Sequence, residues 1–157
     1  MNKKFKDKKF LITGGTGFLG QVLVNKLKFL NCKKIFIVKH KNYDLVHETQ
    51  VKRLYRKYKP DIVFHLAAAV GGIGINEKNP GKFFYENTII ILNIIHHAYL
   101  NKVKKVISTG SVSSYPSNTS LPFEEKNIWN GYPDEINSSY GVAKRIIHAH
   151  SLSYFKQ

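Results

Sequence analysis

The sequence has little cysteine, few acidic residues and no long apolar run. Its one cysteine, Cys32, cannot form an internal disulfide, which excludes a disulfide-stabilised scaffold and fits a reducing, cytoplasmic location. No apolar run is long enough to span a membrane, so we expect no membrane segment. His96 and His97 are adjacent on an expected helix and point in different directions, so we expect no metal site.

Acidic residues are scarce enough to leave a large positive charge. Ten acidic residues face 25 basic ones, a formal net charge of +15, which favours phosphorylated or other polyanionic ligands. Only three basic residues are arginines, and no arginine-rich patch with interleaved aromatics occurs. We therefore expect no nucleic-acid partner. A nucleic-acid module stays a weaker alternative, which salt-sensitive binding would reveal.

What is present is typical of a folded α/β domain. At 157 residues, with 43% hydrophobic and 13% aromatic content, the chain suits one domain over residues 1–157. Apolar runs alternate with helical patterns, which predicts a Rossmann-like, doubly wound parallel sheet of four strands. The expected strands are Phe10–Ile12, Lys34–Val38, Asp61–Leu66 and Val103–Ser108. The expected helices are 18–27, Val46–Tyr58, Pro80 to about Asn101, and 138–157, with a flexible loop at Val70–Gly74.

Glycines follow the first strand at regular spacing. Gly14, Gly17 and Gly20 permit a tight turn, close approach of the backbone to a pyrophosphate, and close packing of the next helix. The helix N-terminus offers free N–H groups to phosphates. We therefore expect a dinucleotide site that includes Thr16, Phe18 and Leu19, the alternative being a simple glycine turn.

The end of the second strand indicates which dinucleotide binds. Lys39-His40-Lys41 follows it, and no acid occurs before Asp44, so a 2′-phosphate is favoured over a free 2′-hydroxyl. The alternative is a solvated basic turn. The expected cofactor is NADP(H), with Asp44 and Leu45 nearby. The small residues after the third strand leave room for a ligand, and the expected contacts there are Leu66, Ala67 and Ala68.

A hydroxyl-rich segment and a Tyr-x-x-x-Lys pair could carry chemistry. Ser111 lies in the segment that follows the fourth strand, and Tyr140 and Lys144 lie one turn apart on one helix face. A nearby ammonium stabilises tyrosinate, so the spacing predicts a lowered pKa for Tyr140 and proton exchange near neutrality. An ordinary amphipathic helix is the alternative.

These motifs together resemble the extended short-chain dehydrogenase/reductases of the NAD-dependent epimerase/dehydratase family. Within it, several more specific segments resemble the GDP-L-fucose synthases. They are His65-Leu-Ala-Ala-Ala-Val-Gly-Gly-Ile73, Phe84-Tyr-Glu-Asn87, Ser114-Tyr-Pro116, Trp129-Asn-Gly-Tyr-Pro133 and Asn137-Ser-Ser-Tyr-Gly-Val-Ala-Lys144. The similarity runs nearly end to end.

The resemblance implies epimerisation and NADPH-dependent reduction of GDP-4-keto-6-deoxy-D-mannose. Tyr140 would protonate the C4 oxygen, Lys144 would hold the nicotinamide ribose, and Ser111 would orient the ketone. Tyr140 is expected, like Lys144, to contact the cofactor as well. Ser113 stands where the family's epimerising cysteine is found, and a hydroxyl is far less acidic than a thiol, which puts the epimerase half in question.

The resemblance also implies that the family's last strands and sugar-binding domain lie beyond this chain. A homodimer through the helices around 80–101 and 138–157 is expected. Two alternatives stay open. One is another nucleotide-sugar epimerase or dehydratase, and the other is a non-catalytic NADP-binding module.

Overall fold

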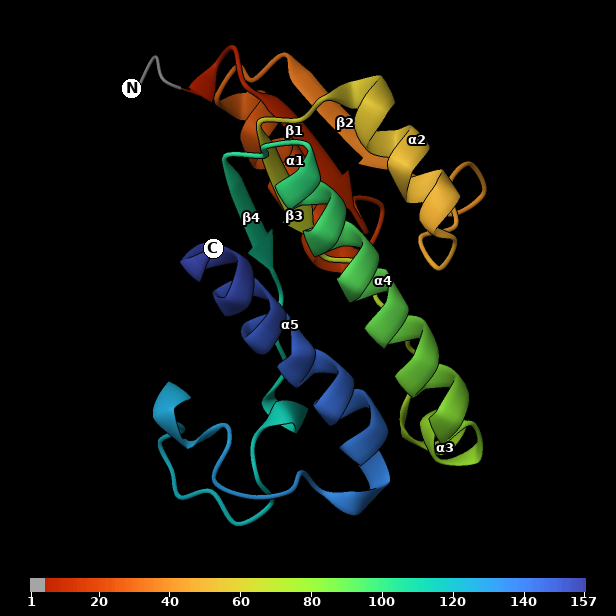
Figure 1. Cartoon of the computed structure of the whole chain (residues 1–157), viewed down its shortest axis with the longest axis vertical. Coiled ribbons are helices and arrows are strands. Elements are labelled where there is room, and N and C mark those ends of the chain that lie inside the picture. Colours follow the sequence, from red (N-terminus) through yellow and green to blue (C-terminus); the bar gives the residue numbers. More distant parts are fainter. Residues whose placement is uncertain (1–4) are drawn as a thin grey trace. The chain divides into compact units, whose positions relative to one another are not determined.

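The computed structural model describes residues 5–157, which form two compact units (Figure 1). The sheet unit contains the chain up to Ala68 together with Asn93–Thr109, and the helical unit contains Ala69–Leu92 and Gly110–Gln157. The single domain expected over residues 1–157 includes residues 1–4, which lie outside the described residues. That expectation stays a prediction.

The sheet unit contains the four parallel strands that the sequence predicts. They are β1 (Lys9–Thr13), β2 (Lys34–Val38), β3 (Ile62–His65) and β4 (Lys105–Ser108). Their order in the sheet is β2-β1-β3-β4. From β1 the chain first forms β2 at one edge of the sheet and then continues to β3 on the other side of β1. The topological switch point therefore lies between β1 and β3. Open α/β sheets bind ligands at this point, outside the carboxyl ends of the strands.

β3 begins one residue later and ends one residue earlier than expected, and β4 begins two residues later than expected. Asp61 precedes β3, and its carboxylate accepts a 2.9 Å bond from the Lys9 amide. Val103 precedes β4, and its N–H donates to the Ala98 carbonyl at 2.9 Å, so it still closes the preceding helix.

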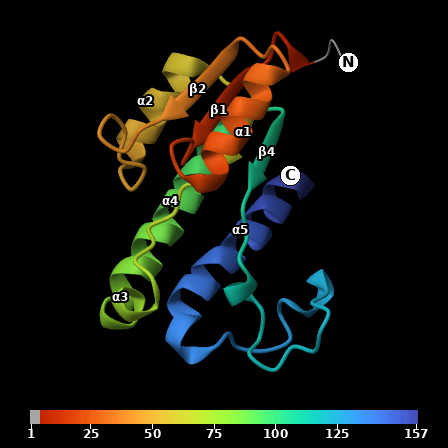
Figure 2. The ribbon, with the colours of Figure 1, turned by 180° about the vertical axis from the view of Figure 1, so that it is seen from behind.

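Helices cover both faces of the sheet. α1 (Phe18–Phe29) lies on the face seen in Figure 2, and α2 (Glu48–Tyr58) lies on the opposite face. The end of α4 (Pro80–Leu100) also packs there, since the Tyr55 hydroxyl donates to the Ile94 carbonyl at 2.8 Å. α2 begins two residues later than expected because the Asp44 carboxylate accepts the Val46 amide at 3.0 Å and forms a turn before the helix.

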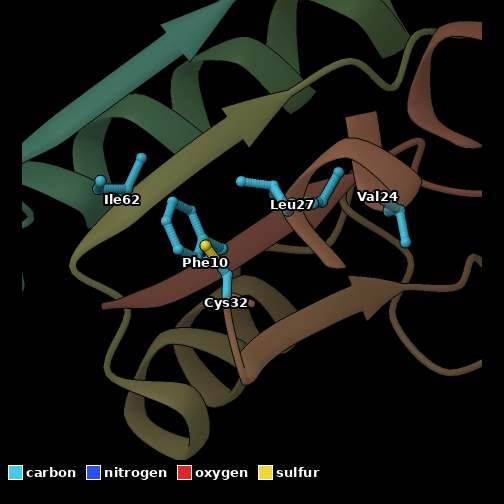
Figure 3. Close-up of a cluster of buried hydrophobic side chains, with 6 residues drawn as sticks. Phe10, Val24, Leu27, Cys32 and Ile62 are labelled. Carbon is cyan, nitrogen blue, oxygen red and sulfur yellow. The ribbon is translucent and has the colours of Figure 1, made fainter. Parts of the chain in front are cut away.

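Side chains of β1 alternate between the two faces of the sheet and contribute to the buried core on each face. Phe10 and Ile12 point to the same side, where they form a buried cluster with Val24 and Leu27 of α1 and with Cys32 and Ile62 (Figure 3). Leu11 points to the opposite side and is fully buried there. A strand buried on both faces accounts for its continuous apolar sequence.

The helical unit contains the remaining elements. They are α3 (Ile73–Lys78), the start of α4, the short 3-10 turns η2 (Val112–Ser114), η3 (Glu125–Asn127) and η4 (Glu135–Asn137), and α5 (Ser138–Lys156). The loop expected at Val70–Gly74 is partly wrong, because α3 begins inside it. Gly72 has φ +75°, which turns the chain sharply and lets a helix start at the next residue.

The contact at Gly20 predicts a large cost for a single methyl group. A Cβ there would lie 2.1 Å from the Gly14 carbonyl oxygen and 2.6 Å from the Gly15 Cα. We expect Gly20→Ala to lower the free energy of unfolding by about 1–3 kcal/mol in urea titration, since backbone must move. The control is Gly81→Ala in α4, where nothing lies within 4 Å of the added atom. Equal stability of the two variants would contradict the close contact.

Candidate functional site

Three backbone segments of the sheet unit meet at the glycine turn. Gly14 has φ +69°, and a Cβ there would lie 2.8 Å from both the Ala67 nitrogen and the Leu66 carbonyl carbon. Gly14 therefore brings the end of β1 against the segment that follows β3. The predicted residues Gly14, Leu66 and Ala67 come together at the switch point of the sheet.

The turn leaves the start of α1 open to an anion. Gly17 is the N-cap without a side-chain cap, and the first helical bond runs from the Gln21 amide to the Gly17 carbonyl at 2.9 Å. The amides between them have no intrahelical acceptor, and no acidic residue lies in the first turn. Phe18 and Leu19 are 92% and 52% exposed, as a contact with a ligand requires.

The basic residues after β2 form an exposed turn. Lys39, His40 and Lys41 are all exposed, and the Lys39 carbonyl accepts the amides of Asn42 and Tyr43 at 3.0 and 3.1 Å. Two ammonium groups on such a turn can close on a phosphate.

Asp44 and Leu45 continue this turn in a different environment. The Asp44 carboxylate lies 3.9 Å from the His40 ring and 3.7 Å from the His47 ring. Leu45 is only 6% exposed, so its side chain belongs to the core. The roles expected for both residues stay predictions.

Sequence reasoning missed a buried polar pair at the same edge of the sheet. Thr13 and His65 are paired in the β1–β3 register, and Thr13 Oγ1 lies 2.8 Å from His65 Nδ1. The Thr13 hydroxyl also accepts the Ala67 amide at 3.2 Å. The pair thus fixes where the chain leaves β3. Two polar residues that end apolar strands were the available signal.

In the helical unit, Ser111 caps a tight turn. Its side chain accepts the Ser113 amide at 3.2 Å, and the Ser114 amide donates to its carbonyl at 3.1 Å. The hydroxyl hydrogen of Ser111 is not used by the first of these bonds, so it can donate to a substrate oxygen. A hydroxyl that accepts one bond becomes a stronger donor of another.

α5 brings Tyr140 and Lys144 to this turn. Lys144 Nζ lies 5.7 Å from the centre of the Tyr140 ring, which confirms that one turn of helix puts them on the same face. α5 contacts η2 directly. Gly141 makes this approach possible, since a Cβ there would lie 2.0 Å from the Ser113 carbonyl oxygen. Ser111, Ser113, Tyr140 and Lys144 thus belong to one packed group.

The expected direction of the Tyr140 pKa is wrong in the free protein. Burial raises the pKa of Tyr140 above its ordinary value of 10.0, and burial lowers the pKa of Lys144 below 10.5. Desolvation of both side chains outweighs the attraction that their spacing predicts. Tyr140 is therefore protonated at neutral pH, which is the form that donates a proton.

A second missed residue is Asn87 of α4, which is 1% exposed. Its side chain donates to the Ala69 carbonyl at 2.9 Å and accepts the Ala69 amide at 2.9 Å. It donates as well to the Phe83 carbonyl of its own helix at 2.8 Å. The amide thereby fixes the main chain that follows the Ala67–Ala68 segment. An asparagine within an apolar helix was its sequence signal.

Among residues 5–157, no group of three or more His, Cys, Asp or Glu side chains could hold a metal ion. Over the same residues, no helix is both long and apolar enough to cross a membrane.

Known proteins resemble this chain in sequence and in fold. The family model for the NAD dependent epimerase/dehydratase family matches residues 10–157, and the chain belongs to that family. A Drosophila melanogaster protein named probable GDP-L-fucose synthase is 36% identical over 149 residues, which cover 94% of this chain and 46% of that protein. The resemblance to GDP-L-fucose synthases is thereby confirmed.

Solved structures extend the comparison. The Naegleria fowleri GDP-L-fucose synthetase bound to NADP superimposes with a TM-score of 0.89 and is 32% identical, over 96% of this chain and 46% of that one. The GDP-mannoheptose C4 reductase of Campylobacter jejuni, with NADP bound, gives 0.92 and 31%, over 97% and 48%. The chain spans about half the length of the relatives it matches.

The raised pKa of Tyr140 predicts a specific pH dependence of stability. The folded protein prefers the protonated phenol, so this contribution is complete below pH 10.0 and is lost as the pH rises through the folded pKa. Relative to Tyr140→Phe, the wild type should lose free energy of unfolding in urea titrations as the pH rises above 10.0. Tyr55, whose pKa burial also raises, is present in both proteins and cancels. A constant difference across this range would contradict the burial of the phenol.

Proposed function

We propose that this chain carries the cofactor-binding and catalytic residues of an NADPH-dependent nucleotide-sugar epimerase/reductase of the GDP-L-fucose synthase type. The observation that carries the proposal is the group on α5, in which Lys144 Nζ lies 5.7 Å from the Tyr140 ring and the Ser111 turn packs on the same helix. Reduction of a sugar ketone requires a proton donor close to the ketone oxygen, and this group of side chains supplies one. The relatives named for GDP-sugars support the choice of substrate class.

The residues of the sheet unit fit NADP(H). The close approach at Gly14 leaves main chain, without a side chain, to face a pyrophosphate, and the open start of α1 offers amides. Thr16, Gly17 and Gly20 belong to the same turn. Phe18 and Leu19 present exposed side chains beside it.

The remaining cofactor contacts follow from the strand ends. Lys39, His40 and Lys41 would hold the 2′-phosphate on their exposed turn. Asp44 and Leu45 would support the end of this turn, where the Asp44 carboxylate accepts the Val46 amide. Leu66, Ala67 and Ala68 would line the adenosine and ribose. When bound, NADPH supplies the hydride that reduces the ketone.

The protein's own groups complete the reduction. The protonated phenol of Tyr140 donates its proton to the C4 oxygen of the sugar, and the Ser111 hydroxyl donates a hydrogen bond that orients this oxygen. Lys144 would hold the nicotinamide ribose and, as an ammonium beside the ring, would stabilise the phenolate left behind. The ketone becomes an alcohol.

Epimerisation at C3 and C5 is the less supported half of the function. It requires removal of a proton from carbon, and the hydroxyl of Ser113 is a much weaker acid than the thiol that the family uses at this position. We therefore propose reduction as the principal chemistry of this group of residues.

Specific experiments would distinguish the two alternative functions. Another nucleotide sugar would be revealed by product analysis, and a non-catalytic module would bind NADPH without turnover. The homodimer through the helices around 80–101 and 138–157, the location in the cytoplasm, and the lack of a nucleic-acid partner stay predictions. Exposed apolar side chains on α5, such as Phe155 at 87%, support a protein contact there.

The choice of NADPH over NADH can be tested by charge removal. We expect Lys39→Ala combined with Lys41→Ala to weaken NADPH binding roughly tenfold or more, followed by nicotinamide fluorescence, since two charge-assisted bonds to phosphate are lost. NADH binding should not change. Lys28→Ala, at the far end of α1, is the control and should leave both affinities unaltered. Equal losses for NADPH and NADH would remove the basis for a 2′-phosphate site.

The role of Tyr140 can be tested with GDP-4-keto-6-deoxy-D-mannose. We expect Tyr140→Phe to lower kcat for NADPH oxidation by roughly 10²- to 10⁴-fold, because the proton donor is lost, with a much smaller effect on NADPH affinity. Tyr99→Phe on α4 is the control. A wild-type chain that binds NADPH without oxidising it in the presence of this sugar would favour the non-catalytic module.

A further inference from the structure

Arg145 is the buried residue of α5 that the proposed chemistry does not use. It follows Lys144 directly and so points away from the Tyr140–Lys144 face. It is only 5% exposed. Within the described residues its guanidinium forms no ion pair with a carboxylate, and burial lowers its pKa. A charge kept in such a place is costly unless its hydrogen bonds have a purpose.

The guanidinium instead holds two main-chain segments. Arg145 Nε donates to the Ser114 carbonyl at 2.5 Å, and Nη1 donates to the Gly131 carbonyl at 2.8 Å. Its Cζ also lies 5.6 Å from the centre of the Trp129 ring. Ser114 ends the turn that Ser111 caps. One side chain thus ties both the Ser111 turn and the Trp129–Gly131 segment to α5.

The two segments are also joined to each other beside Arg145. The Ser117 amide donates to the Tyr132 carbonyl at 3.1 Å, and Pro116 and Pro133 form an isolated antiparallel bridge. A Cβ on Gly131 would lie 3.1 Å from the Pro116 ring. The ends of the loop between Pro116 and Pro133 are therefore held together, and Arg145 binds both ends to the helix that carries Tyr140.

The chemistry of this anchor requires arginine. A planar fork of donors can reach two carbonyl oxygens at once, whereas a lysine ammonium on a flexible stem cannot hold both in a fixed geometry. Nη2 is buried with no hydrogen-bond partner among residues 5–157. An apolar side chain of similar length would avoid the cost of burying an unpaired donor. The contribution specific to the guanidinium is therefore its two hydrogen bonds to main-chain carbonyls.

We propose that Arg145 is a positioning residue, which holds the Ser111–Ser114 turn on α5 and thereby fixes the Ser111 hydroxyl relative to Tyr140. The proposal rests on the proposed function for its consequence in catalysis. The hold itself is a property of the helical unit alone. Loss of the anchor would let the turn move, and a displacement of about 1 Å at reacting groups is enough to slow a reaction roughly a hundredfold.

The test compares Arg145→Met, Arg145→Lys and a control, Arg56→Met, on an exposed position of α2. Amide hydrogen exchange should become faster at Ser113, Ser114 and Ser117 in Arg145→Met and remain unchanged at Leu66, whose amide donates to the Thr13 carbonyl. With NADPH and GDP-4-keto-6-deoxy-D-mannose, kcat should fall roughly tenfold to hundredfold, with NADPH affinity unchanged. Arg145→Lys should recover part of the loss, and it replaces Arg145→Met if that variant does not fold.

The outcomes separate this proposal from the proposed function. Unchanged exchange at the three serines, or faster exchange with unaltered kcat, overturns the role of Arg145. A fall in kcat accompanied by loss of NADPH affinity also overturns it, because that result reports general unfolding. If the wild type binds NADPH but does not turn over the sugar, the proposed function fails, and the exchange rates alone decide whether Arg145 holds the turn.

Discussion

The sheet unit depends on one close approach between backbones. At the carboxyl ends of β1 and β3, Gly14 comes so near the Leu66–Ala67 peptide that no side chain fits between them. The Thr13–His65 pair holds the same two strand ends from the core side. α1 can start where it does only because Gly20 then passes the Gly14 carbonyl without a Cβ. The open amides at the start of α1 follow from that path.

The helical unit solves a similar problem with different means. α5 reaches the Ser111 turn because Gly141 has no side chain there, and the Arg145 guanidinium then secures the turn from the other side. The missing side chain of Gly141 and the hydrogen-bond donor of Arg145 both act on the Ser111–Ser114 turn. The result is that the hydroxyl, phenol and ammonium groups of this unit sit on main chain that is held at several points rather than on a free loop.

Sequence patterns predicted the strands and the spacing of the candidate site because those depend on local periodicity. The four-stranded parallel sheet follows from short apolar runs that alternate with helical patterns, and the shared face of Tyr140 and Lys144 follows from their spacing of four residues. Long-range bonds were beyond that reasoning. Nothing near Asn87 in the sequence indicates that its amide bonds Ala69, and Arg145 contacts residues 14 and 31 positions away. The raised pKa of Tyr140 was missed for the same reason, because burial is a property of the fold.

Ser113 shows how a fold can separate shape from reactivity at one residue. Its amide is committed to the Ser111 side chain, and its carbonyl lies under Gly141, yet its hydroxyl takes part in neither contact. Oxygen and sulfur at this position would rest on the same fixed main chain. An exchange of serine and cysteine there changes the acidity of a single side-chain atom and leaves the main-chain contacts of the turn in place.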